Sequence, residues 1–504
     1  MTETIPDLAL LPVLRGPDEC ACYKKDAGKI LPGAFGPRAK RWGMAGIHEG
    51  FVFDAFPPYF DRFEPILKAT INRLPILADA GIHTFFSGPE SFTPDDAYNP
   101  GPAPEVPNVW VAAGFNSVGI QSAGGASMAQ AQWMDDGEAP FDLGDMDIAR
   151  IQPFQRNRRY LRERATETLG LLYADHWPFR QKATARGVRR SPFHAQLDAM
   201  GAVFGELAGW ERANWFAFPG EAREYSWDWG PQNRFANAAH EHALIRGGAG
   251  FYDMSSFGKL RIKGRDAEAF LNRVYGGDIS VDVGRIVYIQ MLNSRAGVEA
   301  DVTVTRLSET AWLMVTPAAM RVKDDAWLRR HLGDANVVIT DVTAGKAVLA
   351  VMGPKSREVM RAISPGDFST EAFPFGTARE IEAGLGFAVK TGTPADFIGR
   401  DAVLRKREEG LTRRMLQFRL RESHVMLYHN EPILRDGRIV GHVASGAHGH
   451  HPGGAMGLCY VPCADESVAD LLGSDWSVEV AGRRVAADAS FAPMYDPKGE
   501  QLKT

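Results

Sequence analysis

The order of hydrophobic and polar residues between 258 and 278 changes from the period of a strand to that of a helix. GKLRIK alternates, GRD is typical of a turn, and AEAFLNRV places apolar side chains on one helical face at Phe270, Leu271 and Val274. Asp266 is expected to cap this helix and Gly276 to end it. The stretch therefore predicts a strand, a turn and a helix.

Strand patterns recur through the second half of the chain. Residues 287–307 predict a strand, a turn and a second strand, and residues 311–317 predict a third strand. Pro317 has no backbone N–H to donate within a sheet, so it is expected at the end of that strand. Residues 411–495 predict several further strands, with a hairpin turn at Asp436–Gly437.

The first 140 residues mix short apolar runs with glycine and proline. Residues 83–96 predict a strand that enters a turn-rich loop, and residues 106–117 predict a second strand. The second strand is nearly continuously apolar at Val109, Trp110, Val111 and Ala112, which is typical of a strand covered on both faces. The spacing then becomes helical, and either Asn116 or Ser117 is expected to cap the helix.

This helix is built from very small residues, namely Gly119, Ala123, Gly124, Gly125 and Ala126. Two interpretations remain open. A helix N-terminus offers unpaired backbone N–H groups and a partial positive charge, which suit a phosphate or the electron-rich edge of a reduced flavin ring. Small side chains are equally typical of a helix that packs tightly on a sheet.

Composition narrows the class of protein. The chain has 504 residues, of which 45% are hydrophobic and 24% charged, so it is long enough for several cores and more than one domain. A net charge of −5 argues against a protein whose main partner is nucleic acid. Arginines gather in residues 154–164 and 180–190, where a solvated helix face or linker is expected and a positive patch is the alternative.

The compartment is predicted from cysteines and apolar segments. Four cysteines form no disulfide framework and suit a reducing compartment. The N-terminus has no basic segment followed by an apolar one, and no stretch reaches the roughly 18 uncharged apolar residues of a membrane span. We therefore expect a cytoplasmic protein that associates with no membrane.

A zinc site is a weak alternative near the C-terminus. Its ligands would come from His448, His450, His451, Cys459 and Cys463. Because their spacing matches no common closed zinc site, no metal is expected. Cys20 and Cys22 are expected on one strand face, as inert side chains.

Several segments carry a family resemblance. In the first half they are FSGPESFTPDD, VPNVWVAAGFNSVGIQSAGGA, QPFQRNRRYLRERATETLGLLYADHWPFR and RGVRRSPFH. In the second half they include YDMSSFGKLRIKGRDAEAFLNRV, MLNSRAGVEADVTVTRL, EAFPFGTAREI, EAGLGFAVK and EPILRDGRIVGHVASGAHGH. Together they resemble, in consistent order over nearly the whole chain, the dimethylglycine and sarcosine dehydrogenase family of flavin-dependent oxidoreductases.

The resemblance implies a multidomain α/β and α+β protein. Its parts would be a partial amino-acid oxidase-like FAD domain at 1–140, a central connector at 141–195, a folate-binding domain similar to aminomethyltransferase (T-protein) at 196–408, and a C-terminal β-barrel at 409–504. It also implies two coupled reactions. FAD would take a hydride from an N-methyl carbon of a glycine-like amine, and tetrahydrofolate would capture the one-carbon unit.

The resemblance also implies site residues. Those expected at the flavin are Phe115, Asn116, Ser117, Val118 and Gly119, with Gly124 and Gly125 leaving room beside them. Asp301 occupies the position of the family's folate-facing aspartate.

Asp301 is also placed by the period of its strand. Alternation puts it on the face of Thr303 and Thr305, opposite Val302 and Val304. A carboxylate there can accept a proton from, or stabilise, a cationic amine that is being attacked. Without the resemblance, an aspartate in this place is more often simply solvated.

The chain departs from the family pattern in three places. The chain has no G-x-G-x-x-G motif, whose glycines let a pyrophosphate reach a helix N-terminus. The nearest matches, residues 247–253 and 384–389, have the first two glycines of the motif and lack the third. The adenine-binding half of the flavin domain, with any histidine that attaches FAD, is therefore expected to be missing. A long family segment is also missing at Ile381–Glu382, which predicts a shortened folate domain with exposed strand edges. Asp96 replaces a usual glycine, so a positive φ is expected there.

Three hypotheses follow. The chain is an enzyme whose nucleotide-binding half comes from a partner subunit, a folate-binding or regulatory protein without flavin, or a truncated product without a stable function.

Overall fold

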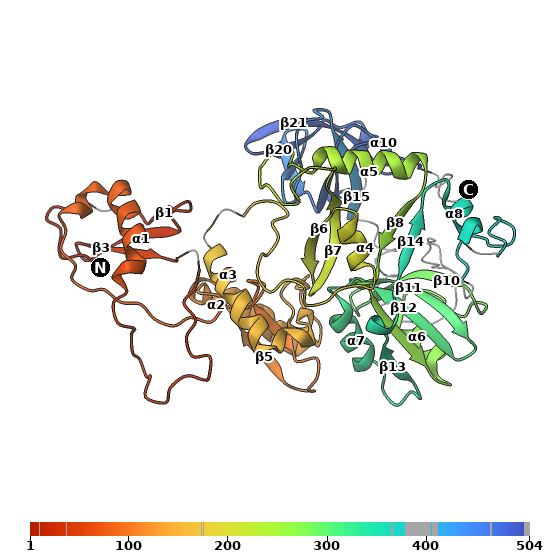
Figure 1. The fold of residues 1–504 in the computed structure, drawn as a ribbon, viewed down its shortest axis with the longest axis horizontal. Helices are drawn as coiled ribbons and strands as arrows, with labels where there is room; N and C mark the ends of the chain where they lie inside the picture. Colours follow the sequence, from red (N-terminus) through yellow and green to blue (C-terminus); the bar gives the residue numbers. More distant parts are fainter. Residues whose placement is uncertain are drawn as a thin grey trace. The chain divides into compact units, whose positions relative to one another are not determined.

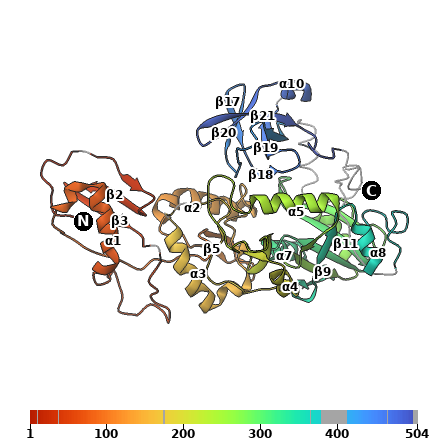
Figure 2. The same cartoon turned by 45° about the horizontal axis from the view of Figure 1, so that its top comes forward.

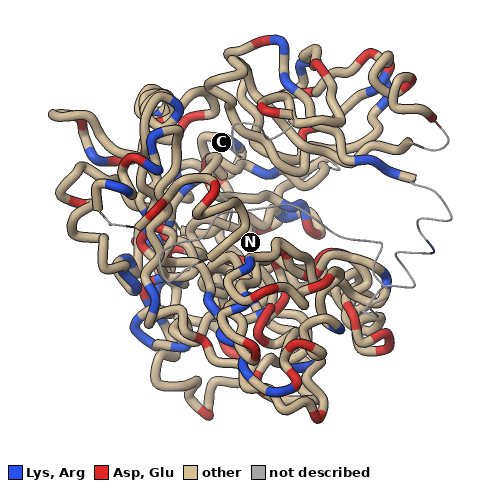
Figure 3. Tube along the Cα trace, turned by 90° about the vertical axis from the view of Figure 1, so that its right-hand side faces the viewer, with Lys and Arg blue, Asp and Glu red and all other residues tan. Residues whose placement is uncertain are grey.

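The structure is a computed structural model that describes residues 1–9, 11–36, 38–172, 174, 176–363, 366–378, 405, 412–463 and 466–497. The chain divides into two compact units, Met1–Arg189 and Arg190–Thr504, which are described here separately (Figure 1). Acidic and basic residues are intermixed along the described trace (Figure 3).

The first unit has short regular elements. A three-stranded antiparallel sheet has the order β1-β2-β3, and a two-stranded ladder joins β4 to β5. The strands are β1 Leu14–Gly16, β2 Ala21–Asp26, β3 Lys29–Ala34, β4 Asn99–Pro102 and β5 Trp110–Ala113. The helices are α1 Phe60–Arg73, α2 Gly119–Asp136 and α3 Arg158–Leu171, with 3₁₀ turns at Pro75–Ala78, Ile148–Arg150 and Pro153–Arg156.

The first unit buries little apolar surface of its own. Ile5, Ile30 and Leu77 form a small core cluster. Large apolar side chains remain exposed on its surface, among them Phe53 and Ile120, which are fully exposed. The unit therefore has apolar surface available for a further layer of protein or a ligand.

Two strand predictions for the first unit are wrong. Residues 83–96, all of which the structure describes, form no strand. The second predicted strand is reduced to β5, and it is not covered on both faces, because Val109 is 45% exposed and Ala112 is also exposed. The reason is that β5 pairs only with the short, proline-containing β4. The continuous apolar run therefore belongs to a half-covered two-stranded ladder.

The predicted cap of α2 is also wrong. The helix begins at Gly119 after Val118, and no side chain of the described residues caps it. Asn116 and Ser117 instead adopt left-handed backbone conformations, with φ of 47° and 67°. Their side chains are bonded to other segments, as described below.

Two further predictions concern single positions in the first unit. Cys20 lies in the turn before β2, with φ of 50°, so only Cys22 is on the strand, and the expectation that the two share a strand face is wrong. Asp96 does have a positive φ, of 70°, which confirms the prediction made from the glycine that usually stands there.

The second unit is built on a five-stranded antiparallel sheet with the order β10-β11-β12-β9-β13. Its strands are β9 Gly258–Lys263, β10 Ile286–Leu292, β11 Val298–Ser308, β12 Ala311–Thr316 and β13 Val338–Asp341. One face of the sheet packs on α6 (Ala267–Val274) and α7 (Arg321–Arg330) to form the largest core cluster, which includes Leu260, Ile289, Val302 and Trp312. Two short ladders, β6–β7 and β8–β14, accompany this sheet.

The remaining elements before residue 378 are short. They are α4 His194–Ala199, β6 Ala202–Leu207, β7 Trp210–Phe216, α5 Phe235–Gly247, β8 Gly250–Asp253, a 3₁₀ turn at Thr343–Gly345, β14 Leu349–Met352 and α8 Ser356–Ile363.

The sequence pattern of the five-stranded sheet is confirmed. β9, α6, β10, β11 and β12 lie where the alternation and the helical spacing placed them, and Pro317 directly follows β12. Asp266 does occupy the N-cap position, but its carboxylate accepts a hydrogen bond from the backbone N–H of Asn336 instead of capping its own helix. The helix ends at Val274, two residues before Gly276.

The C-terminal part is a seven-stranded sheet with the order β17-β16-β20-β21-β15-β19-β18. Figure 2 shows β17 to β21 gathered into one compact group. The strands are β15 Arg413–Leu420, β16 Pro432–Arg435, β17 Arg438–His442, β18 Ser445–Gly449, β19 Gly454–Pro462, β20 Trp476–Val480 and β21 Arg483–Ser490, with α10 at Val468–Leu472.

This sheet curls towards closure. β17 packs against β19, and a Cβ atom on Gly441 would lie 2.7 Å from the carbonyl oxygen of Tyr460. The predicted hairpin turn is confirmed, since Asp436 and Gly437 join β16 to β17 with φ of 49° and 80°. Two positive φ values in a row are the backbone of a type I′ turn, which matches the twist of the strands.

Candidate functional site

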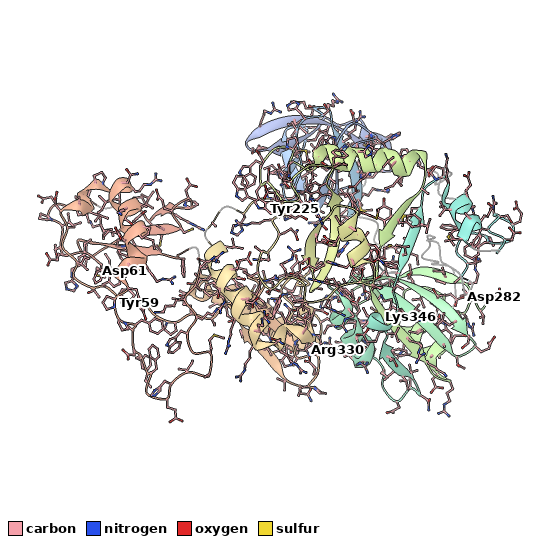
Figure 4. All side chains as sticks on the ribbon, viewed as in Figure 1. Tyr59, Asp61, Tyr225, Asp282, Arg330 and Lys346 are labelled. Carbon is pink, nitrogen blue, oxygen red and sulfur yellow. The ribbon has the colours of Figure 1, made fainter. Side chains whose placement is uncertain are left out.

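The face of the five-stranded sheet opposite its core carries a group of polar side chains on β10 and β11. Asp301 lies directly opposite Gln290, and Thr303 lies directly opposite Tyr288. Because residues two apart on a strand share a face, these four side chains lie on one surface. Asp282, labelled in Figure 4, lies in the loop that leads into β10.

Asp301 faces away from the core, as its strand period predicts. Val302 and Val304 are buried in the core cluster, while Asp301 is exposed. On its other side, pairing of β11 with β12 begins only at Thr303, so Asp301 has a neighbouring strand on one side alone. A carboxylate in this place can meet a ligand without opening the sheet.

Tyr288 is the residue of this group that sequence reasoning missed. Its side chain lies on the same face of the sheet as Gln290, two residues along β10, and Asp301 on β11. Partial burial raises the pKa of Tyr288, and so does the nearby carboxylate of Asp301. The signal for Tyr288 was the alternation YIQ in β10, but its partner on β11 depends on the register, which the sequence does not fix.

The turn that feeds Asp301 into β11 is held by Asn293. Its side-chain oxygen accepts hydrogen bonds from the backbone N–H groups of Gly297 (2.7 Å) and Arg295 (3.1 Å), and its amide donates to Glu299 (2.9 Å). Lys323 on α7 forms an ion pair of 2.9 Å with the same glutamate. These bonds fix the residues just before Asp301.

A second carboxyl group lies on the core side of the same sheet. Asp324 on α7 is 1% exposed and accepts a hydrogen bond from the hydroxyl of Thr316. Burial raises the pKa of Asp324 to about 7, although the hydrogen bond from Thr316 and the charge of Lys323 act in the opposite direction. Asp324 is therefore a buried acid that ionises near neutral pH, separated by the sheet from the polar face.

The start of α2 is the second candidate site. Asn116 is buried, and its side-chain oxygen accepts a hydrogen bond of 2.8 Å from the backbone N–H of Thr93. The hydroxyl of Ser117 donates to Glu90 at 2.8 Å. Phe115 packs against Tyr98, with ring centroids 4.8 Å apart. The side chains of Asn116, Ser117 and Phe115 therefore hold the loop together, which leaves its backbone groups to meet a ligand.

The small residues of α2 leave room beside the helix. A Cβ atom on Gly124 or Gly125 would meet no atom of the described residues within 4 Å. Gly119 is closer to protein, since a Cβ there would lie 3.3 Å from the side chain of Phe115. Among the described residues, the face with Gly124 and Gly125 is thus uncovered and can receive a flat group or another protein surface.

The histidines and cysteines near the C-terminus pack against other side chains. Over the described part of the chain, no group of three or more His, Cys, Asp or Glu is placed to hold a metal ion. The rings of His448 and His450 pack 4.9 Å apart, and His450 packs at 4.9 Å on His242 of α5. Burial raises the pKa of Cys459 to about 12, so its thiol stays protonated and unreactive.

Comparison with known families covers most of the chain. A profile of the GCVT N-terminal domain matches residues 193–390, one of the FAD dependent oxidoreductase central domain matches 136–191, and one of the glycine cleavage T-protein C-terminal barrel domain matches 413–496. The predicted domain limits at 140, 195 and 408 stay predictions.

Three curated relatives span nearly the whole chain. A 4-methylaminobutanoate oxidase (formaldehyde-forming) of Paenarthrobacter nicotinovorans is 34% identical, over 98% of this chain and 68% of the relative. Human mitochondrial sarcosine dehydrogenase is 26% identical, over 100% of this chain and 67% of the relative. The mitochondrial pyruvate dehydrogenase phosphatase regulatory subunit of Mus musculus is 27% identical, over 93% of this chain and 64% of the relative.

The alignments bear on length and membrane association. The first runs over 569 positions, whereas this chain has 504 residues, so at least 65 aligned positions of that relative have no counterpart here. The predicted omission at Ile381–Glu382 lies outside the described residues.

No helix in the described ranges is long and apolar enough to cross a membrane.

Proposed function

The chain belongs to the dimethylglycine and sarcosine dehydrogenase family of FAD-dependent oxidoreductases with a T-protein-like part, and on this premise we propose that it acts in oxidative demethylation of an N-methylated glycine-like amine. The one-carbon unit passes to tetrahydrofolate. The observation that carries the proposal is the polar face of β10 and β11, where Asp301, Gln290 and Tyr288 share the side of the sheet opposite its buried core.

The substrate class follows from the chemistry in the relatives' names. 4-Methylaminobutanoate and sarcosine are both amino acids with a methyl group on nitrogen. FAD, when bound, accepts a hydride from that methyl carbon and leaves an iminium ion. One relative is named as formaldehyde-forming, so release of the one-carbon unit as formaldehyde is the alternative to its transfer to tetrahydrofolate.

The room beside α2 supports our placing the ring system of FAD at the start of this helix. Phe115, Val118 and Gly119 lie at the helix N-terminus, and the uncovered face at Gly124 and Gly125 offers room for a flat group. The pyrophosphate has no counterpart of this kind, because the chain contains no G-x-G-x-x-G segment. A partner subunit or further polypeptide would supply that half.

Asp301 acts in capture of the one-carbon unit. A folate nitrogen adds its lone pair to the iminium carbon, and the electrons of the C=N bond pass to the amine nitrogen. The folate nitrogen becomes cationic and releases a proton, which the Asp301 carboxylate accepts. The amine nitrogen then takes up this proton and leaves as its bond to the carbon breaks, and a second folate nitrogen bonds to the carbon and releases its own proton to solvent. Before that step, the negative charge of Asp301 stabilises the iminium ion.

The experiment is a visible spectrum of the purified chain after incubation with FAD and gel filtration, alone and with candidate partner subunits. We expect flavin absorbance to be retained when a subunit that supplies the nucleotide-binding half is present, and to bleach without oxygen on adding sarcosine, dimethylglycine or 4-methylaminobutanoate. With tetrahydrofolate present, methylene-tetrahydrofolate should form. Retained flavin that no N-methyl amine reduces would contradict the proposal.

A second candidate function is favoured by one relative. The regulatory subunit in the same family is 27% identical over most of the chain, so a folate-binding or regulatory protein without flavin catalysis is the alternative. It predicts tetrahydrofolate binding with no retained flavin under any condition. A truncated product without stable function predicts the absence of a cooperative melting transition.

A further inference from the structure

Two oppositely charged side chains of the first unit lack the partners that partly buried charges usually have. Asp96 is partly buried, and its Oδ1 atom is enclosed without a hydrogen-bond donor. Lys182 is also partly buried, and within the described part of the chain its ammonium group donates no hydrogen bond and forms no ion pair. Because a buried charge without a partner is costly, such a pair indicates a place that a further molecule completes.

The charges around this pair are used within the fold. Asp95, the neighbour of Asp96 in the sequence, forms an ion pair of 2.7 Å with Arg150. The carboxylate of Glu167 on α3 accepts hydrogen bonds of 2.8 Å from both of the backbone N–H groups that directly follow Lys182. These acidic groups stabilise the unit itself, whereas Asp96 and Lys182 have no such task.

Helix α3 brings the two side chains to one place. The hydroxyl of Thr168 donates a hydrogen bond of 3.2 Å to the carbonyl oxygen of Pro94, two residues before Asp96. Glu167, the preceding residue of the same helix, holds the segment that follows Lys182. Both segments are thus fixed to adjacent residues of α3. Burial raises the pKa of Asp96 and the charge of Lys182 lowers it, which agrees with this placement.

The turn that carries Asp96 is also bonded to the loop where we place the flavin ring. The backbone N–H of Thr93 donates to the side-chain oxygen of Asn116 at 2.8 Å, and the amide of Asn116 donates to the Thr93 hydroxyl at 3.1 Å. Both residues are buried. The position of Asp96 relative to the start of α2 is therefore fixed, and a molecule held at Asp96 lies close to that loop.

We propose that Asp96 and Lys182 together bind a zwitterionic amino acid, with its ammonium group at the carboxylate of Asp96 and its carboxylate at the ammonium group of Lys182. An ionised carboxylate only accepts hydrogen bonds and an ammonium group only donates them, so each end of the ligand meets the group that it requires. A ligand with one charge would leave the other side chain unpaired.

The identity of the zwitterion rests on the proposed function, because an N-methylated amino acid carries both charges. The pairing of the charges with Asp96 and Lys182 does not rest on it.

The test titrates ligands against the full chain by saturation-transfer NMR. The probes are the zwitterions sarcosine and 4-methylaminobutanoate, and dimethylamine, which carries the cation alone. Lys182→Gln removes the ammonium group, and Asp96→Asn removes the negative charge at nearly the same shape. Asp96→Gly is a second variant in case the first disturbs folding, because it relieves a φ of 70°. The control is Lys68→Gln, at an exposed lysine of α1 that pairs with Glu64 at 2.7 Å.

The wild-type chain should bind at least one zwitterion, and Lys182→Gln should weaken this binding roughly tenfold or more, as expected for a charged hydrogen bond. Lys182→Gln should leave the binding of dimethylamine unchanged, whereas both Asp96 variants should weaken the binding of zwitterion and cation alike. Lys68→Gln should bind every probe as the wild type does. A merely structural role for Lys182 would weaken the binding of dimethylamine as well.

The outcomes separate this site from the proposed function. Zwitterion binding that is absent from the wild type, or that is equal in the wild type and in the Asp96 and Lys182 variants, overturns the site, and water then completes the two charges. If binding follows the expected pattern but no N-methylated amino acid reduces the flavin of the loaded protein, the site stands and the proposed function fails.

Discussion

Replacing Asp324 by asparagine tests whether a buried acid sets the pH dependence of stability in the second unit. Asp324 is 1% exposed, and its carboxylate accepts a hydrogen bond from Thr316. Asparagine has nearly the same shape, and its side-chain oxygen can accept the same hydrogen bond. The substitution therefore removes the ionisation and leaves the packing nearly unchanged.

The magnitude follows from the pKa of Asp324, which burial raises from 3.8 to about 7. Between these values the folded state binds the proton more tightly than the unfolded chain, so the free energy of unfolding falls as pH rises. Each unit of pKa difference corresponds to about 1.4 kcal/mol, so about three units amount to roughly 4 kcal/mol. The loss is absent below pH 3.8 and complete above about pH 7.

Urea unfolding, followed by tryptophan fluorescence at several pH values, measures the effect. We expect the gain in stability of Asp324→Asn over the wild type to grow as pH rises from about 4 to 7 and then to level off. Asp325→Asn is the matched control, because its carboxylate pairs with Arg329 at 2.9 Å near the surface of the same helix. Such a pair contributes less than about 1 kcal/mol.

A difference between Asp324→Asn and wild type that stays constant over this pH range would refute the reasoning. It would mean that Asp324 ionises in the folded protein as easily as in water, so that burial of its carboxylate carries no penalty.

Three further predictions concern other positions. Burial and the neighbouring His448 and His242 lower the pKa of His450, so the unfolded chain binds a proton at this residue more readily than the folded protein does, and stability is lost as pH falls below 6.5. His450→Asn should reduce this loss of stability in acid, measured by thermal melting at several pH values, and an unchanged pH profile would contradict the prediction. Asp96→Gly should stabilise the first unit by about 1 kcal/mol or more, since it relieves a φ of 70° and removes a buried carboxylate oxygen without a hydrogen-bond partner. The control Asp7→Gly relieves a φ of 55° at an exposed residue, so equal gains of both variants in urea unfolding would show that burial of the Asp96 carboxylate costs nothing. Gly457→Ala should destabilise the C-terminal part by about 1–3 kcal/mol in thermal melts, because a Cβ atom at this position would overlap the ring of Phe418. An unchanged melting temperature would show that the ring can move aside without cost.

Periodicity predicted the parts of the fold that depend on short-range pattern. β9, α6 and the strands around Asp301 lie where alternation and helical spacing placed them, because one face of this sheet is buried and the other is not. The strand predicted at 83–96 failed, because an apolar run forms a strand only when a partner strand pairs with it.

Interactions between distant residues could not be predicted in the same way. Asn116 was expected to cap α2, but its side chain is bonded to Thr93, 23 residues earlier in the chain. Tyr288 was missed because its place beside Asp301 depends on the register of β10 against β11. The burial of Asp324 likewise depends on how α7 packs on the sheet.

Calorimetry with tetrahydrofolate tests most directly whether the polar face of β10 and β11 is a binding site. The wild-type chain is compared with Asp301→Ala and with Asp282→Ala, an exposed aspartate in the loop before β10. The account predicts that the wild type and Asp282→Ala bind alike, and that Asp301→Ala binds at least about tenfold more weakly, as expected for the loss of a charged hydrogen-bond partner. Equal binding by all three proteins would contradict it.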